Sequence, residues 1–138
     1  MVFRYLKETN NYSGIIELPH NDTIKYFEIR TINPVNWTAN SIAYCLMELN
    51  FCITDDIEIG MILYSANSAF PNQQIPLANL IGTKENPQWK KAYINFTQAI
   101  GEEGTRYQMK NFDIYIKTYS PVNGKARFLF DNIKLVYS

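Results

Sequence analysis

The chain has 138 residues, of which 46% are hydrophobic, and 13 Lys and Arg balance 13 Asp and Glu. This size and composition predict one globular domain with its own core rather than a disordered chain. Zero net charge argues against a nucleic-acid partner, and no apolar run approaches the roughly 18 residues of a membrane helix, so we expect no direct membrane insertion. Ten Tyr, eight Phe and two Trp are typical of strand-rich domains and of surfaces that stack against ligands.

Period-two alternation, the pattern of half-buried strands, starts in the first quarter of the chain. In residues 24–32, one face carries Phe27 and Ile29. The other face carries polar and aromatic side chains: Tyr26, Glu28 and Arg30. Residues 56–65 are apolar on both faces, which predicts a central strand of a sandwich.

Residues 37–51 fit two structures. Ile42, Cys45, Leu46 and Leu49 recur at helical spacing, and Thr38 could cap such a helix. The same segment also alternates, with Cys45, Met47, Leu49, Phe51 and Ile53 on one face. We favour a strand, because a lone helix would interrupt a series of strands on both sides.

The two cysteines, Cys45 and Cys52, are seven residues apart. On one extended strand they would point to opposite faces, roughly 23 Å apart, too far for a disulfide. We therefore expect two reduced, buried thiols, unless a turn separates them.

Further strands are predicted at residues 91–97, 111–120 and 126–138. The strand 111–120 sends Phe112, Ile114 and Ile116 one way and Asp113, Tyr115, Lys117 and Tyr119 the other. Residues 101–106, with the sequence Gly-Glu-Glu-Gly-Thr-Arg, lack a strand–loop–helix context for phosphate binding and are predicted to form a turn. Seven or more short strands joined by polar turns indicate an all-β sandwich.

No catalytic constellation is visible. His20 is the single histidine and lies in a turn-like segment, so a catalytic triad or a zinc site has no second imidazole. The acidic pairs Asp55-Asp56 and Glu102-Glu103 are better interpreted as solvated turns than as a glycosidase pair. We expect a protein that is not an enzyme.

Asp131 falls on the apolar face of the predicted last strand, with Leu129, Ile133 and Leu135. Either a bulge turns it outward and moves Phe128 and Phe130 inward, or it is buried with partners. We favour a structural role that ties the strand to a neighbouring loop. Loss of such a carboxylate in Asp131→Ala would cost on the order of 1–3 kcal/mol.

The aromatic residues give the best functional lead. Tyr115 and Tyr119 share a face with Lys117, and Trp37 lies in a loop. Sugars stack their apolar ring faces on aromatic side chains beside hydrogen-bonding groups, so these four residues are the candidate ligand-binding residues. The alternative is that the tyrosines cover a sheet or face another domain.

The order of segments in residues 40–138 resembles the galactose-binding-like jelly-roll domains of Bacteroidetes surface lipoproteins. Those domains are similar in layout to carbohydrate-binding modules. The resemblance rests on the Trp89-Lys90-Lys91 approach to the strand at 92–97 and on the run from Asp131 to Leu135. It implies an all-β jelly-roll sandwich of two antiparallel sheets with little or no helix. We expect one such domain over residues 1–138, alone or excised from a longer chain.

The resemblance also implies a function and a cellular location. The first hypothesis is a non-catalytic glycan-binding module at the cell envelope or outside the cell, on the outer-membrane surface. The second is a structural or docking domain that contacts other domains of a parent lipoprotein, and a hydrolase is a distant third. Related modules often hold a structural calcium near the last strand, which makes Asp131 a candidate ligand, while no cofactor is required. Met1 is followed by no apolar stretch, so we expect no signal peptide in this chain.

Overall fold

The computed structural model of the protein describes residues 2–8, 11–21, 23, 25–31, 35–36 and 44–137. Ten strands and one helix lie in this part of the chain. They are β1 (Val2–Glu8), β2 (Asn11–Pro19), β3 (Tyr26–Arg30), β4 (Val35–Asn36), β5 (Cys45–Ile53), β6 (Ile57–Ser65), β7 (Gln73–Leu80), β8 (Lys90–Asn95), α1 (Thr97–Arg106), β9 (Met109–Tyr119) and β10 (Lys125–Tyr137).

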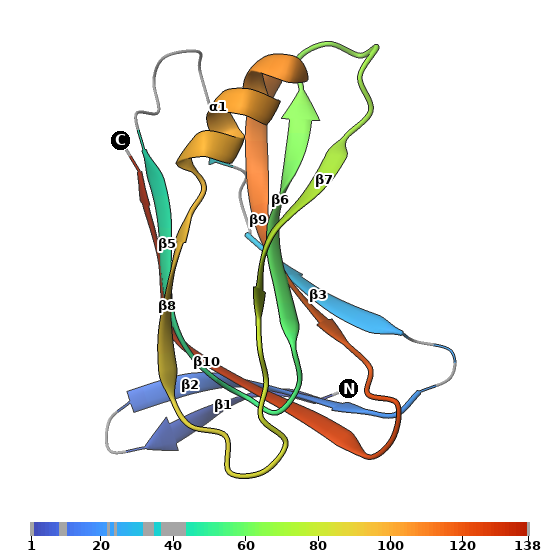
Figure 1. The fold of residues 1–138 in the computed structure, drawn as a ribbon, viewed down its shortest axis with the longest axis vertical. Helices are drawn as coiled ribbons and strands as arrows, with labels where there is room; N and C mark the ends of the chain where they lie inside the picture. Colours follow the sequence, from blue (N-terminus) through green and yellow to red (C-terminus); the bar gives the residue numbers. More distant parts are fainter. Residues whose placement is uncertain are drawn as a thin grey trace.

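The strands form two antiparallel sheets that pack face to face (Figure 1). One sheet has the order β1-β2-β10-β5-β8, and the other has the order β3-β9-β6-β7, with β4 also paired to β9. Consecutive strands such as β5 and β6 lie in different sheets, as in a jelly roll. The predicted all-β jelly-roll sandwich with little helix is confirmed.

The core consists of the inward-facing side chains of both sheets. Along β5 every second residue from Cys45 to Ile53 is buried. In the opposite sheet, β9 contributes Phe112, Ile114 and Ile116 to the same core. Strand β6 lies between β9 and β7 and is buried from Ile59 to Leu63, so the prediction of a central strand at 56–65 is confirmed. Burial of a large apolar side chain stabilises the fold by about 1.5–3 kcal/mol.

The ambiguous segment 37–51 is a strand where the structure describes it, because β5 begins at Cys45 and runs to Ile53. Residues 37–43 lie outside the described part of the chain. Cys45 points into the main core, and Cys52 points to the opposite face, where it joins a small cluster with Ile15 and Leu129. Both thiols are free and buried, as predicted.

The predicted turn at residues 101–106 is wrong, because this segment belongs to helix α1. Ile100 is buried on one side of the helix, and Gly104 packs against Met109 of β9. The hydroxyl of Thr97 accepts a hydrogen bond of 3.0 Å from the backbone N–H of Cys45, which fixes the helix start to β5. Two glycines lower helix propensity, and tertiary burial overrides this preference.

The last strand contains the bulge that we considered for Asp131. Pairing with β5 shifts register between Asp131 and Lys134, and Asn132 adopts a φ of 50°. As a result Phe128 and Phe130 point into the core, and Asp131 is only half-buried. Its carboxylate accepts a hydrogen bond of 2.7 Å from the neighbouring N–H of Asn132, so Asp131 has a local contact rather than the buried anchoring role that we favoured.

Candidate functional site

The outer side of the β3-β9-β6-β7 sheet carries a group of aromatic and polar side chains. In Figure 1, the upper part of β9 runs alongside β6, and its lower part turns sideways together with β3. The sheet is therefore bent, and its outer side is the concave side of the bend. We call it the concave face. Among its residues are Tyr26, Glu28, Arg30, Glu58, Gly60, Tyr64, Gln74, Asp113, Tyr115, Lys117 and Tyr119, and the apolar Ile62 lies between them.

One end of the concave face is an aromatic pair around a lysine. Tyr26 and Tyr119 are directly opposite each other in the β3–β9 pairing, and they are 52% and 45% exposed. The ammonium of Lys117 lies 4.2 Å from the centre of the Tyr26 ring and 5.4 Å from that of Tyr119. These cation–π contacts hold both rings in place at the surface.

The middle of the concave face is occupied by Tyr115. Its side chain is 0% exposed, and its hydroxyl donates a hydrogen bond of 2.9 Å to Glu58. The ring lies over Gly60, where a Cβ atom would come within 2.5 Å of the phenol oxygen, so only glycine leaves room for it. Burial is the main cause that raises the pKa of Tyr115 above its usual range, and the bond to Glu58 adds to it.

Asp113 lies at the other end of the face and is 6% exposed. Its two carboxylate oxygens accept hydrogen bonds of 2.7 Å from the Thr31 hydroxyl and 2.6 Å from the Tyr64 hydroxyl. Burial, followed by this bond to Asp113, raises the pKa of Tyr64. The carboxylate thus joins β9 to β6 and to the end of β3.

The side chains of β3 reach across the face. The carboxylate of Glu28 contacts the guanidinium of Arg30 with one oxygen and accepts a bond of 3.4 Å from the Gln74 amide with the other. Glu28 belongs to β3 and Gln74 to β7, and these strands are separated by β9 and β6. Three strand spacings correspond to about 14 Å in a flat sheet, so this contact requires a strongly curved surface.

The structure therefore brings together three of the predicted ligand-binding residues, Tyr115, Lys117 and Tyr119, on one face of β9. Of these, Tyr119 is open to solvent, whereas Tyr115 is buried beneath its neighbours. Trp37 lies outside the described residues, and its role stays a prediction. Asp131 belongs to the other sheet, and its role as a calcium ligand also stays a prediction.

Sequence reasoning missed the residues that β3, β6 and β7 contribute. The alternation in 24–32 did place Tyr26, Glu28 and Arg30 on one face, but their position beside β9 depends on strand pairing between residues about 90 apart in sequence. No sequence pattern indicated that Gln74 or Gly60 would belong to this face.

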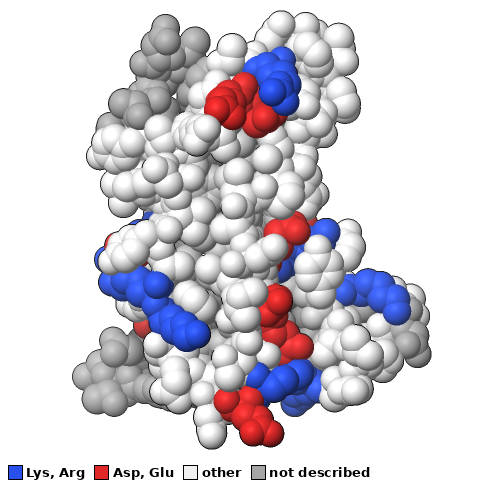
Figure 2. All heavy atoms as spheres, viewed as in Figure 1, with Lys and Arg blue, Asp and Glu red and all other residues white. Residues whose placement is uncertain are grey.

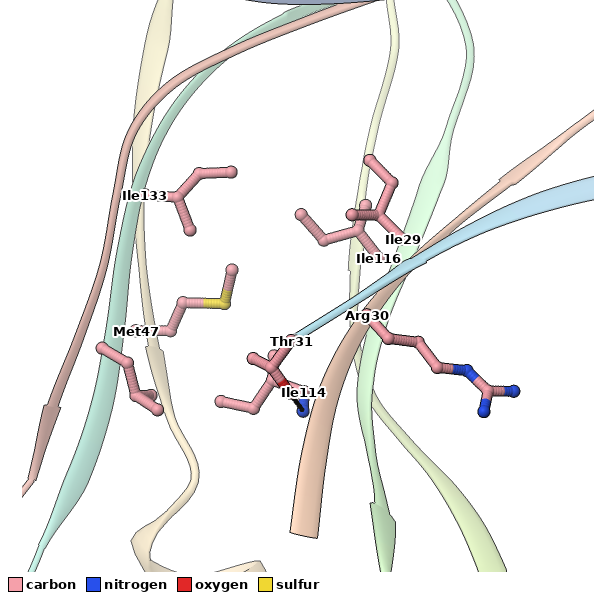
Figure 3. A pocket seen from close by; sticks show the side chains of 8 residues that line it. Ile29, Arg30, Thr31, Met47, Ile114, Ile116 and Ile133 are labelled. Atoms are coloured by element: carbon pink, nitrogen blue, oxygen red, sulfur yellow. Dashed lines mark hydrogen bonds between the residues drawn. The ribbon is translucent and has the colours of Figure 1, made fainter. Parts of the chain in front are cut away.

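A separate pocket of about 270 Å³ lies between the two sheets (Figure 3). Its walls are apolar: Ile29, Ile114 and Ile116 face Met47, Ile133 and Leu135. Arg30 points away from this pocket, toward the concave face (Figure 3). The pocket offers contacts for apolar groups and little hydrogen bonding.

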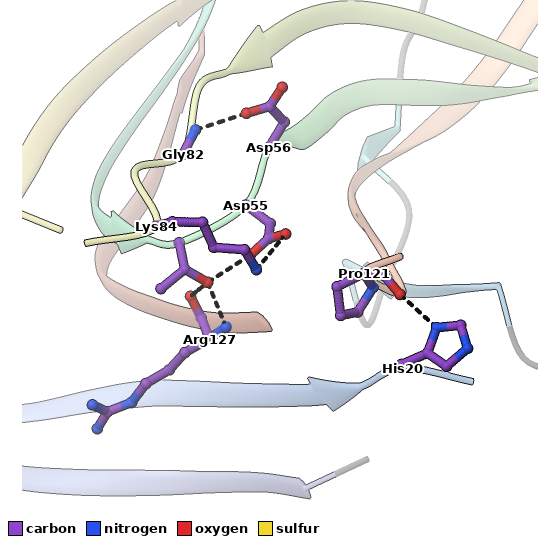
Figure 4. Close-up of polar contacts among 8 residues, drawn as sticks. His20, Asp55, Asp56, Gly82, Lys84, Pro121 and Arg127 are labelled. Carbon is purple, nitrogen blue, oxygen red and sulfur yellow. Dashed lines mark hydrogen bonds and ion pairs between the residues drawn. The ribbon is translucent and has the colours of Figure 1, made fainter. Parts of the chain in front are cut away.

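The acidic pair and the histidine singled out in the sequence have structural partners (Figure 4). Asp55 accepts a bond of 2.8 Å from the Lys84 ammonium, and Asp56 accepts one of 2.8 Å from the Gly82 N–H. These bonds join the β5–β6 turn to the loop before β8. His20 Nδ1 lies 2.9 Å from the carbonyl of Pro121, which links two turns at the same end of the molecule.

Charged side chains of both signs lie on the surface of the part of the chain that the structure describes (Figure 2). On the side shown in Figure 2, acidic and basic groups alternate in small clusters. Among the described residues, no three His, Cys, Asp or Glu side chains lie close enough together to hold a metal ion. In the same residues, no helix is long and apolar enough to cross a membrane.

No protein-family model matches the sequence, and no curated protein matches it significantly. Solved structures do match the fold. One is a carbohydrate-binding module, CBM28, specific for non-crystalline cellulose, with a TM-score of 0.55 and 9% identity over 96% of this chain and 79% of that one.

Another match is a carbohydrate-binding module of the β-sandwich superfamily, from work on promiscuous specificity. It has a TM-score of 0.52 and 6% identity, and the match covers 98% of this chain and 53% of that one, so this chain spans about half of it. At these identities the likeness concerns the fold. The chain has the β-sandwich fold of carbohydrate-binding modules.

Proposed function

We propose that this protein is a non-catalytic module that binds a glycan on its concave face. The observation that carries the proposal is the exposed pair Tyr26 and Tyr119, held around Lys117 beside a row of hydrogen-bonding groups. Apolar faces of sugar rings stack on such tyrosines, while carboxylate and ammonium groups bind the hydroxyls. The shared fold with a cellulose-specific module supports this assignment.

The carboxylates of the face fit a binding role better than a catalytic one. Asp113 accepts two hydroxyl donors, Glu58 accepts the Tyr115 hydroxyl, and Glu28 contacts Arg30 and Gln74. Each of these carboxylates already accepts hydrogen bonds from neighbouring side chains, whereas hydrolysis needs two carboxyl groups free to flank a glycosidic bond. We place the module in a secreted or surface-anchored protein, as the resemblance to lipoprotein domains implies.

A second candidate function is docking to another protein domain. The observation that favours it is on the outer side of the other sheet, where Leu46 and Val136 are paired and are 40% and 47% exposed. Tyr93, which is 72% exposed, lies two positions along on the neighbouring strand β8. Apolar side chains grouped in this way are typical of protein contacts.

Native affinity electrophoresis separates the two functions. We would embed hydroxyethyl cellulose, mixed-linkage β-glucan, xylan or polygalacturonate in the gel and compare the wild type with Tyr26→Ala, Tyr119→Ala and Tyr93→Ala. We expect a retarded wild type and a loss of about two- to twelve-fold in affinity for the first two variants, from the roughly 0.5–1.5 kcal/mol of a lost aromatic contact. Tyr93→Ala, a matched tyrosine on the other sheet, should bind as the wild type does.

Equal retardation of all four proteins would place the glycan elsewhere on the surface. If no polysaccharide in the panel and no sugar on a glycan array is bound, the docking function is favoured instead.

A further inference from the structure

The burial of Tyr115 has a specific cause. A residue on the outer side of a four-stranded sheet is normally open to solvent, yet Tyr115 is 0% exposed. Below the ring lies Gly60, and beside it lies the backbone of Ile75 on β7, whose carbonyl oxygen would be 2.3 Å from a Cβ atom at position 60. The ring therefore lies flat across β6 and reaches the edge strand.

The contact between Glu28 and Gln74 spans the same stretch of sheet. It joins β3 to β7, and Tyr115 and Gly60 lie on the two strands between them at a shared register position. Burial is the main cause that raises the pKa of Tyr115, whereas hydrogen bonding by the Gln74 amide lowers it and the charge of Glu28 raises it, in keeping with a position of both side chains near the Tyr115 hydroxyl. The two side chains thus form a bridge over the tyrosine.

This bridge is weak at one end. The Glu28 carboxylate is held by Arg30, on the same strand and face. The bond to Gln74 is long, at 3.4 Å, joins two flexible side chains and comes from an exposed residue. Hydrogen bonds of ordinary strength measure 2.7–3.2 Å, and an exposed amide can exchange its partner for water or a sugar hydroxyl.

We propose that the Glu28–Gln74 bridge is a removable cover, and that Tyr115 and Glu58 beneath it form a hidden hydrogen-bonding floor of the glycan site. The proposal rests on the proposed glycan-binding function. With the bridge closed, a glycan reaches only the Tyr26–Tyr119 end. With the bridge open, it also contacts the Tyr115 hydroxyl and the Glu58 carboxylate in the middle of the face, which lengthens the site toward Asp113.

A cover of this kind lowers the apparent affinity, because only the open fraction of the protein is competent for full binding. Removal of the cover therefore strengthens binding. If Gln74 were instead an ordinary contact residue, its removal would weaken binding. The sign of the effect distinguishes the two roles.

The test uses Gln74→Ala, with Gln73→Ala as the matched control on the same strand. The Gln73 amide donates to the carbonyl of Pro71 and takes no part in the bridge. Affinity electrophoresis would use the polysaccharide that most retards the wild type. We expect Gln74→Ala to bind about two- to three-fold more tightly, the gain that follows when a hydrogen bond at the weak end of the usual range holds the cover closed, and Gln73→Ala to bind as the wild type does.

A second variant tests the floor. Tyr115→Phe keeps the ring and removes the hydroxyl, and when combined with Gln74→Ala it should abolish the gain. Hydroxyl-radical footprinting with mass spectrometry reports the cover without any glycan: Tyr115 should be oxidised several-fold faster in Gln74→Ala than in the wild type or in Gln73→Ala. The retained fold of each variant is checked by its amide NMR spectrum.

Weaker or unchanged binding by Gln74→Ala, in a protein whose wild type binds, would overturn the cover and leave the proposed function intact. Unchanged oxidation of Tyr115 would overturn it as well. Absence of binding by every protein would refute the proposed function, while the footprint would still show whether Gln74 shields Tyr115.

Discussion

The Tyr64 hydroxyl donates a 2.6 Å hydrogen bond to Asp113, a carboxylate that is 6% exposed on the outer side of a sheet. The second oxygen of Asp113 accepts from Thr31. A buried carboxylate is costly unless donors compensate for lost water, and these two hydroxyls do so. Asp113 therefore stabilises the concave face by fixing β9, β6 and the end of β3 to one another.

Replacement of Asp113 tests this role. Asp113→Ala leaves the hydroxyls of Tyr64 and Thr31 without their acceptor, and we expect a loss of about 1–3 kcal/mol in the free energy of unfolding. Asp113→Asn keeps the shape and one carbonyl acceptor, so it should lose less. Urea denaturation followed by circular dichroism measures both, and equal stability of all three proteins would contradict the role.

Asp131 offers a contrasting carboxylate. It is half-buried at a bulge and accepts a bond from the adjacent Asn132 N–H, so Asp131→Ala should change the free energy of unfolding by less than about 1 kcal/mol. We also predict that EDTA leaves the melting temperature unchanged. A melting temperature that falls in EDTA and recovers with calcium would instead assign Asp131 to a structural calcium site.

The cysteines should be inert in the folded protein. Burial raises the pKa of Cys45 from 9.0 to about 11, and it also raises that of Cys52. At pH 8 about one Cys45 thiol in a thousand is then ionised, and the thiolate is the reactive form. We expect Ellman's reagent to label neither cysteine in native protein and both in guanidinium.

The same shift has a consequence for stability. Because the unfolded thiol loses its proton near pH 9 and the folded Cys45 thiol keeps it to about pH 11, stability should fall as the pH rises through this window. Cys45→Ala should remove that part of the pH dependence. In the labelling experiment, a rapid reaction of Ellman's reagent with the native protein at pH 8 would contradict the expected inertness of the cysteines. It would show that the core around β5 opens readily.

Helix α1 provides a test of the corrected secondary structure. Gly101 lies in its interior, and a Cβ atom there would meet nothing within 4 Å. Gly101→Ala should therefore stabilise the protein by about 0.5–1 kcal/mol, because alanine restricts the unfolded chain and favours the helix. Gly104→Ala is the control: its Cβ atom would lie 3.0 Å from the Met109 methyl group, so its gain should be smaller. A lower melting temperature for Gly101→Ala would contradict a helix at this position.

Alternation along single strands predicted much of this architecture. It identified the central strand β6, the strand β5 and the common face of Tyr115, Lys117 and Tyr119. Each of these features follows from side chains that alternate along one strand, and this alternation can be read from neighbouring residues in the sequence.

The remaining features depend on contacts between distant segments. Gly60 leaves room for the Tyr115 ring, and side chains of β3 and β7 contact each other across the two strands between them; neither feature is visible in residues 111–120. Helix α1 contains two glycines and forms because Ile100 and Gly104 pack inward. The bulge at Asn132 requires a positive φ. Asparagine tolerates this conformation, but the presence of an asparagine does not by itself predict a bulge.

Chemical-shift mapping is the most direct test of glycan binding to the concave face. A ¹⁵N-labelled sample would be titrated with a soluble oligosaccharide of the polysaccharide that retards the protein in gels. We predict that amide shifts concentrate in β3, β9, β6 and β7, around Tyr26, Lys117 and Tyr119. Shifts confined to β5, β8 and β10, on the outer side of the opposite sheet, would contradict it.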